Sequence, residues 1–182
     1  MNIVFIGPPL SGKGTQARLL GAQLYIPVFS IGKLLREAYS RGDAQAKEGY
    51  EQYAMRGKNL PISLKFHFLK EKLETATEGF ILENFPSTKE DLDTFLQYLK
   101  TKNLSIDKAF LVHISEEEMQ KRMVTRGRID DTLDIVSKRY VLQGSDRLEV
   151  EKYFKQIGIL AEINGEGSVE EVHKRVMEEI NT

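Results

Sequence analysis

A glycine-rich segment near the start of the chain carries residue types that bind phosphate. The segment GPPLSGKGT, residues 7–15, follows the short apolar run of residues 3–6 and precedes a stretch of helix-forming residues. This order predicts a strand, a phosphate-binding loop and a helix. The backbone N–H groups of such a loop and the positive end of the helix bind anions, and Lys13 adds a cation beside the outer phosphates.

One position of this segment departs from the general pattern of phosphate-binding loops. That pattern places a Ser or Thr directly after the lysine, where its hydroxyl meets Mg²⁺. Here Gly14 follows Lys13, and the hydroxyl comes one residue later, at Thr15. The alternative is a structural turn rich in glycine, but the apolar strand before it and the amphipathic run after it favour phosphate binding.

Five arginines form the second set of residues suited to phosphate chemistry: Arg36, Arg122, Arg126, Arg128 and Arg139. Phosphoryl transfer requires a protein to hold donor and acceptor in line while cations offset the charge of the transferring group. Guanidinium suits this task because it stays protonated and binds phosphate oxygens through a fork of N–H groups. The alternative is solvated charge on a helix face, which the i,i+4 spacing of Arg122 and Arg126 also allows.

Acidic residues also stand near these cations in the sequence. Glu83 ends an apolar run, at the edge of the expected sheet where ligands bind. Asp130 and Asp131 follow the arginine cluster, and the sequence leaves open whether they serve the site or cap the next helix. For Glu83 the alternative is a solvated loop acid.

The composition indicates one sizeable core within 182 residues, of which 41% are hydrophobic and 29% charged. Lys and Arg number 26 against 27 for Asp and Glu, so no overall positive field favours nucleic acid or an anionic membrane as partner. The absence of cysteine excludes disulfides and thiolate chemistry. Without a basic signal-peptide region or a membrane-length apolar run, we expect a cytoplasmic protein that binds neither nucleic acid nor membrane.

Short apolar runs alternate with longer helical patterns along the whole chain. We expect strands at residues 2–6, 27–29, 79–82, 108–114 and 159–163. Helices are expected at residues 11–24, 31–40, 44–56, 62–75, 88–102, 116–126, 132–142 and 169–180. Apolar strands separated by helices predict an α/β fold with a parallel sheet covered on both faces, in which ligands bind at the carboxyl ends of the strands.

Several segments resemble the adenylate kinase family of nucleoside monophosphate kinases, in order and in spacing. Besides the phosphate-binding loop they are FSIGKLLRE at 29–37, GFILENFPST at 79–88, RMVTRGRIDD at 122–131 and INGEGSVEEV at 163–172. The resemblance implies phosphoryl transfer from Mg-ATP to a nucleoside monophosphate, with AMP as the expected acceptor. It also implies a P-loop fold of three αβα layers around a five-stranded parallel sheet, with a helical monophosphate-binding insertion and a lid.

The resemblance implies one kinase domain over residues 1–182. Its core would comprise residues 1–29, 61–126 and 130–182, and the monophosphate-binding insertion residues 30–60. The lid would be reduced to residues 127–129. With no cysteine and no histidines at metal-binding spacing, this lid holds no zinc site. We expect the protein to be a monomer with Mg²⁺ as its cofactor.

The resemblance also assigns residues to two nucleotide sites. The catalytic cations would be Lys13, Arg126, Arg128 and Arg139. The ATP site would use Leu10, Ser11, Gly12, Lys13, Gly14, Thr15, Arg122, Arg126 and Gly167, with Arg122 near the adenine ring, and Glu83 would meet the metal through water. The acceptor site would use Ile31, Arg36, Lys58, Asn59, Leu60, Asn84, Phe85, Pro86, Ser87, Asp91, Arg128 and Arg139.

The acceptor half departs from the family pattern at Ile31, Lys33, Asn84, Ser87 and Asp91, whereas the donor half is nearly intact. Ser87 stands where the family has the arginine that holds the acceptor phosphate, and the loss of such a clamp costs on the order of 2 to 4 kcal/mol in the transition state. Lys33 and Lys89 are candidate replacements, with solvated helix faces as the alternative.

Asp91 stands where the family has a glutamine that reads adenine. A carboxylate complements two donors, as on guanine, so a kinase for GMP, CMP or UMP is one alternative function. The second is a weakened family member that binds ATP and acts as a sensor or binding module. An unrelated phosphate-loop ATPase or transferase is the third.

Overall fold

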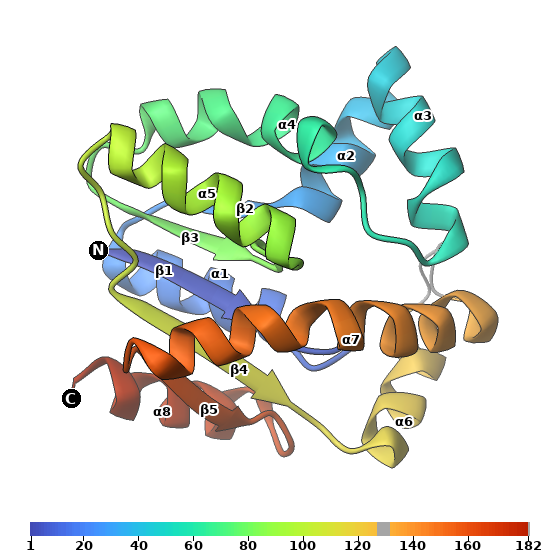
Figure 1. Ribbon diagram of the computed structural model, residues 1–182. Helices are drawn as coiled ribbons and strands as arrows, with labels where there is room; N and C mark the ends of the chain where they lie inside the picture. The colour runs from blue at the N-terminus through green and yellow to red at the C-terminus, as the bar shows by residue number, and fades with distance from the viewer. Residues whose placement is uncertain (127–131, 182) are drawn as a thin grey trace.

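The computed structural model describes residues 1–126 and 132–181, apart from the side chains of residues 124–126 and 133 (Figure 1). Strands and helices alternate along the chain. The strands are β1 (Asn2–Ile6), β2 (Val28–Ser30), β3 (Phe80–Glu83), β4 (Lys108–His113) and β5 (Leu160–Asn164). The helices are α1 (Lys13–Leu24), α2 (Ile31–Ser40), α3 (Ala44–Gln52), the 3₁₀ turn η1 (Ala54–Arg56), α4 (Ile62–Thr75), α5 (Lys89–Thr101), α6 (Glu116–Arg126), α7 (Leu133–Gln156) and α8 (Val169–Ile180).

The five strands form one parallel sheet in the order β2-β3-β1-β4-β5. β1 lies in the middle, and each of its five residues is buried because helices cover both faces of the sheet. Since all strands run in the same direction, the loops that follow them gather at one edge. From β1 the chain first builds β2 and β3 on one side of the sheet and then β4 and β5 on the other side. An open α/β sheet binds its ligands where the strand order reverses in this way, here beside β1.

Successive residues of β1 point to opposite faces of the sheet and enter two different cores. Ile3 and Phe5 pack with α1 and α8, whereas Val4 and Ile6 pack with α4, α5 and α7. Phe5 and Phe110 of β4 stack with ring centroids 4.8 Å apart. This packing fixes β1, and with it the starting point of the phosphate-binding loop.

A group of helices between β2 and β3 forms a separate body at the end of the sheet. α2, α3 and η1 lie to one side of the strands in Figure 1, and α4 returns the chain to the core. This body has its own small core of Leu35, Ala38 and Ala46. It also contacts α7, since Arg139 donates to the Ala54 carbonyl at 3.1 Å.

The expected α/β fold with five parallel strands is confirmed, and each strand lies within one or two residues of its expected range. One helix was predicted too short: α7 continues through Gly144 and Ser145, where the sequence suggested a break. Val150 and Phe154, buried against the sheet, favour continuing the helix more than Gly144 disfavours it. Within the described part of the chain, no helix combines the length and the hydrophobicity that crossing a bilayer requires.

Candidate active site

The loop between β1 and α1 has a backbone that depends on glycine. Gly7 has φ of +145°, and a Cβ there would lie 2.2 Å from the Val112 carbonyl oxygen. Gly12, the residue before α1, has φ of +89°. The loop therefore crosses the end of β4 at close range and delivers its N–H groups to the start of α1, where the helix dipole is positive.

Two polar side chains of this loop are withdrawn from solvent. Lys13 is 9% exposed and donates to the Pro8 carbonyl at 2.9 Å. Ser11 is fully buried, and within the described structure its hydroxyl oxygen has no hydrogen-bond partner. A buried hydroxyl without a partner is costly, and a phosphate oxygen at this loop would offer it one.

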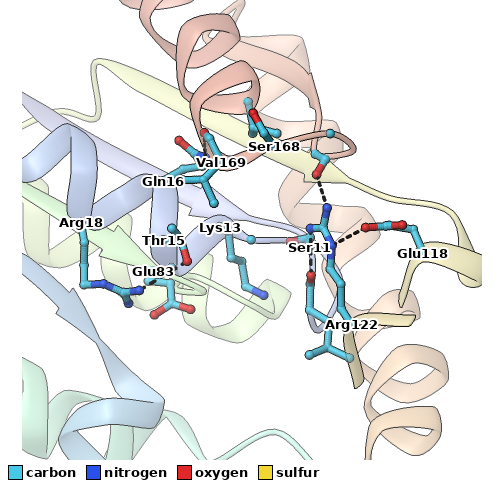
Figure 2. A pocket seen from close by; sticks show the side chains of 16 residues that line it. Ser11, Lys13, Thr15, Gln16, Arg18, Glu83, Glu118, Arg122, Ser168 and Val169 are labelled. Atoms are coloured by element: carbon cyan, nitrogen blue, oxygen red, sulfur yellow. Dashed lines mark hydrogen bonds and ion pairs between the residues drawn. The ribbon is translucent and has the colours of Figure 1, made fainter. Parts of the chain in front are cut away.

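A cavity of about 560 Å³ opens in front of the loop. Figure 2 shows Lys13, Thr15, Arg122 and Val169 converging on it from the loop, α6 and α8. All predicted ATP-site residues lie in its wall except Arg126, whose side chain is outside the described part. The wall also contains residues that the sequence analysis missed: Gln16, Arg18, Glu118, Gly165, Ser168, Val169 and Val172.

Arg122 joins three parts of this cavity. Its guanidinium donates to the Glu118 carboxylate at 2.7 Å, to the Leu10 carbonyl at 3.3 Å and to the Gly165 carbonyl at 2.8 Å. Leu10 lies in the phosphate-binding loop and Gly165 in the loop after β5. The same side chain that was predicted to face the donor nucleotide therefore also links the two loops that form the cavity.

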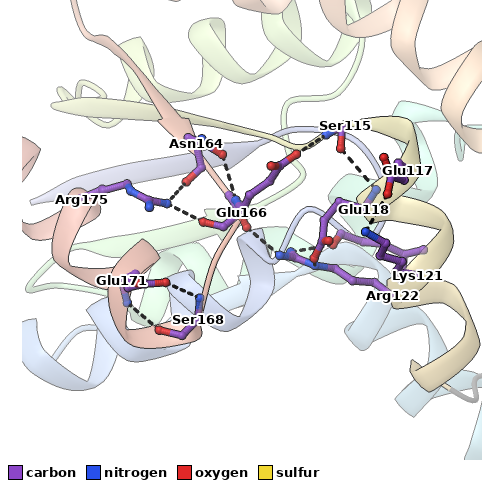
Figure 3. Close-up of polar contacts among 12 residues, drawn as sticks. Ser115, Glu117, Glu118, Lys121, Arg122, Asn164, Glu166, Ser168, Glu171 and Arg175 are labelled. Atoms are coloured by element: carbon purple, nitrogen blue, oxygen red, sulfur yellow. Dashed lines mark hydrogen bonds and ion pairs between the residues drawn. The ribbon is translucent and has the colours of Figure 1, made fainter.

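The loop after β5 is held in shape by a network of hydrogen bonds (Figure 3). Ser168 and Glu171 form a capping box at the start of α8, and Arg175 donates to the carbonyls of Asn164 and Glu166. The Glu166 carboxylate accepts from the Ser115 backbone at 3.0 Å, and hydrogen bonding from the Ser115 side chain and backbone lowers the pKa of Glu166. This network fixes the backbone of Gly167, which lines the cavity.

Glu83 reaches the phosphate-binding loop from the end of β3. A Cβ on Gly14 would lie 2.8 Å from the Glu83 carboxylate oxygen, so the carboxylate occupies the space that a Ser or Thr in the usual pattern would need. This explains the unusual Gly14. The described residues contain no cluster of three or more metal-binding side chains, but Mg²⁺ with ATP needs few protein ligands because phosphates and waters supply the others. The oxygens of Glu83 and Thr15, both in the cavity wall, fit this role.

A second, smaller pocket of about 140 Å³ lies between the core and the helical body formed by α2, α3 and η1. Its wall includes eight of the predicted acceptor-site residues: Ile31, Arg36, Lys58, Asn59, Leu60, Asn84, Ser87 and Arg139. Lys13 and Glu83 line both pockets. The two pockets therefore meet at the lysine of the phosphate-binding loop and at the candidate metal-orienting carboxylate.

Three predicted acceptor residues do not line this pocket. Phe85 is fully buried and packs against Phe66 and Phe95, and Pro86 follows it through a cis peptide bond. Asp91 is 1% exposed and caps the start of α5. Its carboxylate points into the protein, so the structure gives no support to the prediction that Asp91 reads the acceptor base.

The two lysines considered as replacements for the missing arginine lie on solvated faces. Lys33 pairs with Glu37 at 3.7 Å, and its side chain is 68% exposed. Lys89 pairs with Asp93 at 2.6 Å, and its side chain is 60% exposed. Neither lines the second pocket. For both residues the structure therefore favours the alternative, a solvated helix face.

In the second pocket the sequence analysis missed a buried cation, Lys65. It lines the second pocket from α4, is 3% exposed, and its ammonium lies 2.9 Å from the Ser87 hydroxyl and 2.6 Å from the Asp91 carboxylate. Burial lowers the pKa of Lys65, and the neighbouring Asp91 offsets this in part. A signal was present in the sequence: Lys65 stands four residues before Leu69 and eight before Leu73, on the apolar stripe of its helix.

Several predicted residues fall outside the described structure. They are the side chain of Arg126 and the residues Arg128, Asp130 and Asp131, together with the whole expected lid, residues 127–129. Their roles stay predictions.

Comparisons with known proteins agree with this geometry. The family model described as adenylate kinase matches residues 5–159. An adenylate kinase from Corynebacterium urealyticum is 35% identical over 179 residues, which cover 97% of this chain and 97% of the relative. An adenylate kinase from Leptospira biflexa is 32% identical, over 98% of this chain and 99% of the relative. An adenylate kinase from Thermobifida fusca is 30% identical, over 97% of this chain and 96% of the relative. With two adjoining pockets that meet at the lysine of a phosphate-binding loop, this chain belongs to the adenylate kinase family of phosphotransferases.

Proposed function

We propose that this protein catalyses reversible phosphoryl transfer from Mg-ATP to AMP. The observation that carries the proposal is the pair of pockets that share Lys13 and Glu83. A donor in the larger pocket and an acceptor in the smaller one would meet at these two side chains. Transfer in line between the two then needs no covalent enzyme intermediate.

The residues of the site divide into three roles. The phosphate-binding loop and Lys13 would hold the donor phosphates, and Arg139 and Arg36, both in the wall of the smaller pocket, would face the acceptor. Arg126 and Arg128 would place positive charge beside the transferring phosphoryl group. Magnesium, which Glu83 and Thr15 would meet through water or directly, neutralises charge on the phosphates when it is bound.

The test is ADP formation from Mg-ATP with AMP, GMP, CMP and UMP, each measured separately. We expect turnover that depends on AMP, and we expect Lys13→Met to reduce kcat at least 100-fold because it removes the cation from the meeting point of the pockets. Lys89→Met serves as the matched control, since it removes an exposed lysine that lines neither pocket.

The alternatives give different results. Faster turnover with another monophosphate would make the protein a kinase for that nucleotide. ATP binding without acceptor-dependent turnover would instead favour a sensor or binding module. A cytoplasmic monomer is the expected form of the enzyme, and light scattering of the purified protein tests the oligomeric state.

A further inference from the structure

A buried ion pair lies behind the wall of the acceptor pocket. Lys65 of α4 and Asp91 of α5 are 2.6 Å apart, with side chains 3% and 1% exposed. Buried ion pairs contribute little net stability, because removing two charges from water offsets most of their attraction. The position of this pair at the pocket therefore calls for a functional explanation.

The two partners differ in their access to the pocket. Asp91 uses one carboxylate oxygen to accept four hydrogen bonds, from the Lys65 ammonium, the Ser87 hydroxyl and the backbone N–H groups of Ser87 and Thr88. It does not line the pocket, whereas Lys65 does. A ligand in the pocket would meet the ammonium before it met the carboxylate.

The ammonium of Lys65 has a hydrogen-bond donor to spare. An ammonium carries three N–H groups. Within the described part of the chain, two acceptors surround it, the Ser87 hydroxyl and the Asp91 carboxylate. The third N–H belongs to a side chain that is 97% buried and borders the pocket, so it is placed to bind an acceptor atom of a ligand there.

The location of the ammonium matches the position of the missing clamp. It lies 2.9 Å from the hydroxyl of Ser87, the residue that replaces the expected phosphate-binding arginine. The ammonium comes from a lysine 22 residues earlier in the sequence, on α4, and lies beside the side chain of Ser87. We propose that Lys65 binds the monophosphate group of the acceptor nucleotide, in place of an arginine at position 87.

Asp91 then acts as a positioning residue. It fixes the ammonium beside Ser87, and its own carboxylate is held in place by hydrogen bonds from the backbone N–H groups of Ser87 and Thr88. These groups and the start of α5 also offset part of its negative charge, which leaves the ammonium able to attract a phosphate. This inference rests on the proposed function of the smaller pocket as the acceptor site.

The test uses the double variant Lys65→Met/Asp91→Asn, which removes both charges at nearly constant volume and leaves no unpaired buried charge. The readouts are the dissociation constant of AMP, measured by calorimetry, and the inhibition constant of adenosine as a competitor of AMP. Adenosine has the same base and ribose as AMP but no phosphate. The matched control is Lys89→Met/Asp93→Asn, which removes an exposed lysine–aspartate pair from α5 itself.

We expect the double variant to bind AMP at least tenfold more weakly, while adenosine inhibition and ATP binding change by less than twofold. The control should leave all three values unchanged. An unchanged AMP affinity would overturn the inference in favour of a structural ion pair. An equal loss for AMP and adenosine would also overturn it, because the contact would then be to the base or ribose.

Two further measurements keep the test decisive. If the double variant does not fold, the ¹⁵N resonance of the Lys65 ammonium in the wild-type protein replaces it: a shift with AMP and none with adenosine supports the inference, and the reverse overturns it. Wild-type ADP formation reports separately on the proposed function. If the wild type turns over AMP and the double variant binds AMP as tightly as the wild type, only the role of Lys65 is refuted. If the wild type does not bind AMP, both proposals are refuted.

Discussion

Replacing Lys65 by methionine alone should destabilise the fold strongly. The substitution preserves the length of the side chain but leaves the carboxylate of Asp91 buried without its cation. Removing one partner of a buried ion pair costs about 3–5 kcal/mol. Asp91 keeps the hydrogen bonds from the Ser87 backbone, the Ser87 hydroxyl and the Thr88 backbone, so we expect a value near the lower end, about 3 kcal/mol.

The assay is urea unfolding of the wild type, Lys65→Met, Asp91→Asn and the double variant, analysed as a double-mutant cycle. For a chain of this length, a loss of about 3 kcal/mol lowers Tm by roughly 6–12 °C. The double variant should lie within about 1 kcal/mol of the wild type, because it removes both charges together. The coupling between the two positions should therefore be at least about 2 kcal/mol.

The same pair gives a pH dependence of known sign. Burial lowers the pKa of Lys65 from its ordinary value of 10.5, with partial compensation from Asp91, Asp146 and Glu90. The unfolded chain then binds this proton more tightly than the native protein does. As pH rises from the lowered pKa toward 10.5, the wild type should gain stability relative to the double variant.

Two results would refute this reasoning. A loss below about 1 kcal/mol for Lys65→Met would show that the Asp91 carboxylate tolerates the removal of its cation, which contradicts a buried ion pair. A double variant as unstable as Lys65→Met would show that the loss comes from packing of the lysine stem rather than from an unpaired charge. Lys89→Met/Asp93→Asn, which removes an exposed pair, should change stability by less than about 0.5 kcal/mol.

Four further predictions concern other parts of the fold and site. Gly144→Ala should raise stability by about 0.5–1 kcal/mol in urea unfolding, since Gly144 lies inside α7 and a Cβ there contacts nothing within 4 Å; unchanged or lower stability would contradict the continuous helix. Phe95→Ala should cost about 3–5 kcal/mol because Phe95 is fully buried between Phe80 and Phe85; a cost below about 1 kcal/mol would contradict this packing. Arg122→Ala should weaken ATP binding at least tenfold in calorimetry, since it removes the hydrogen bonds that join the two loops of the donor cavity; unchanged affinity would contradict that role. Gly14→Ala should leave the fold intact but raise the Mg²⁺ concentration needed for half-maximal ADP formation, because the new methyl group must displace the Glu83 carboxylate; an unchanged magnesium requirement would show that Glu83 does not act on the metal.

Most of the fold could be predicted because its signals are local. Each strand is a short apolar run, and the glycine and proline residues of the first loop mark the change from strand to helix. The length of α7 could not be predicted in this way. Gly144 and Ser145 are weak helix formers, and only the distant contacts of Val150 and Phe154 with the sheet explain why the helix continues past them.

The donor site was predictable for a related reason. Its phosphate-binding part consists largely of backbone N–H groups, and the sequence of a loop constrains its backbone directly. The hydroxyl at position 15 and the glycine at position 14 looked like a defect in the pattern. In three dimensions the glycine makes room for Glu83, which comes from another strand. A local departure was thus explained by a contact with a residue far away in the sequence.

The acceptor site could be predicted only in part from its motifs because its side chains come from separate elements: eight of the predicted residues line the smaller pocket, but Lys65 was missed. Position 87 is a serine where the family pattern has an arginine, and no position near it in sequence carries a buried cation instead. The cation enters instead from Lys65 on α4, and Asp91, predicted to read the base, holds it in place. Both residues stand on the apolar faces of their helices, beside Leu69 and Phe95 respectively. Two opposite charges on facing apolar stripes predict a buried pair. A missing motif residue therefore indicates lost function only when no such pair supplies the missing charge from another part of the chain.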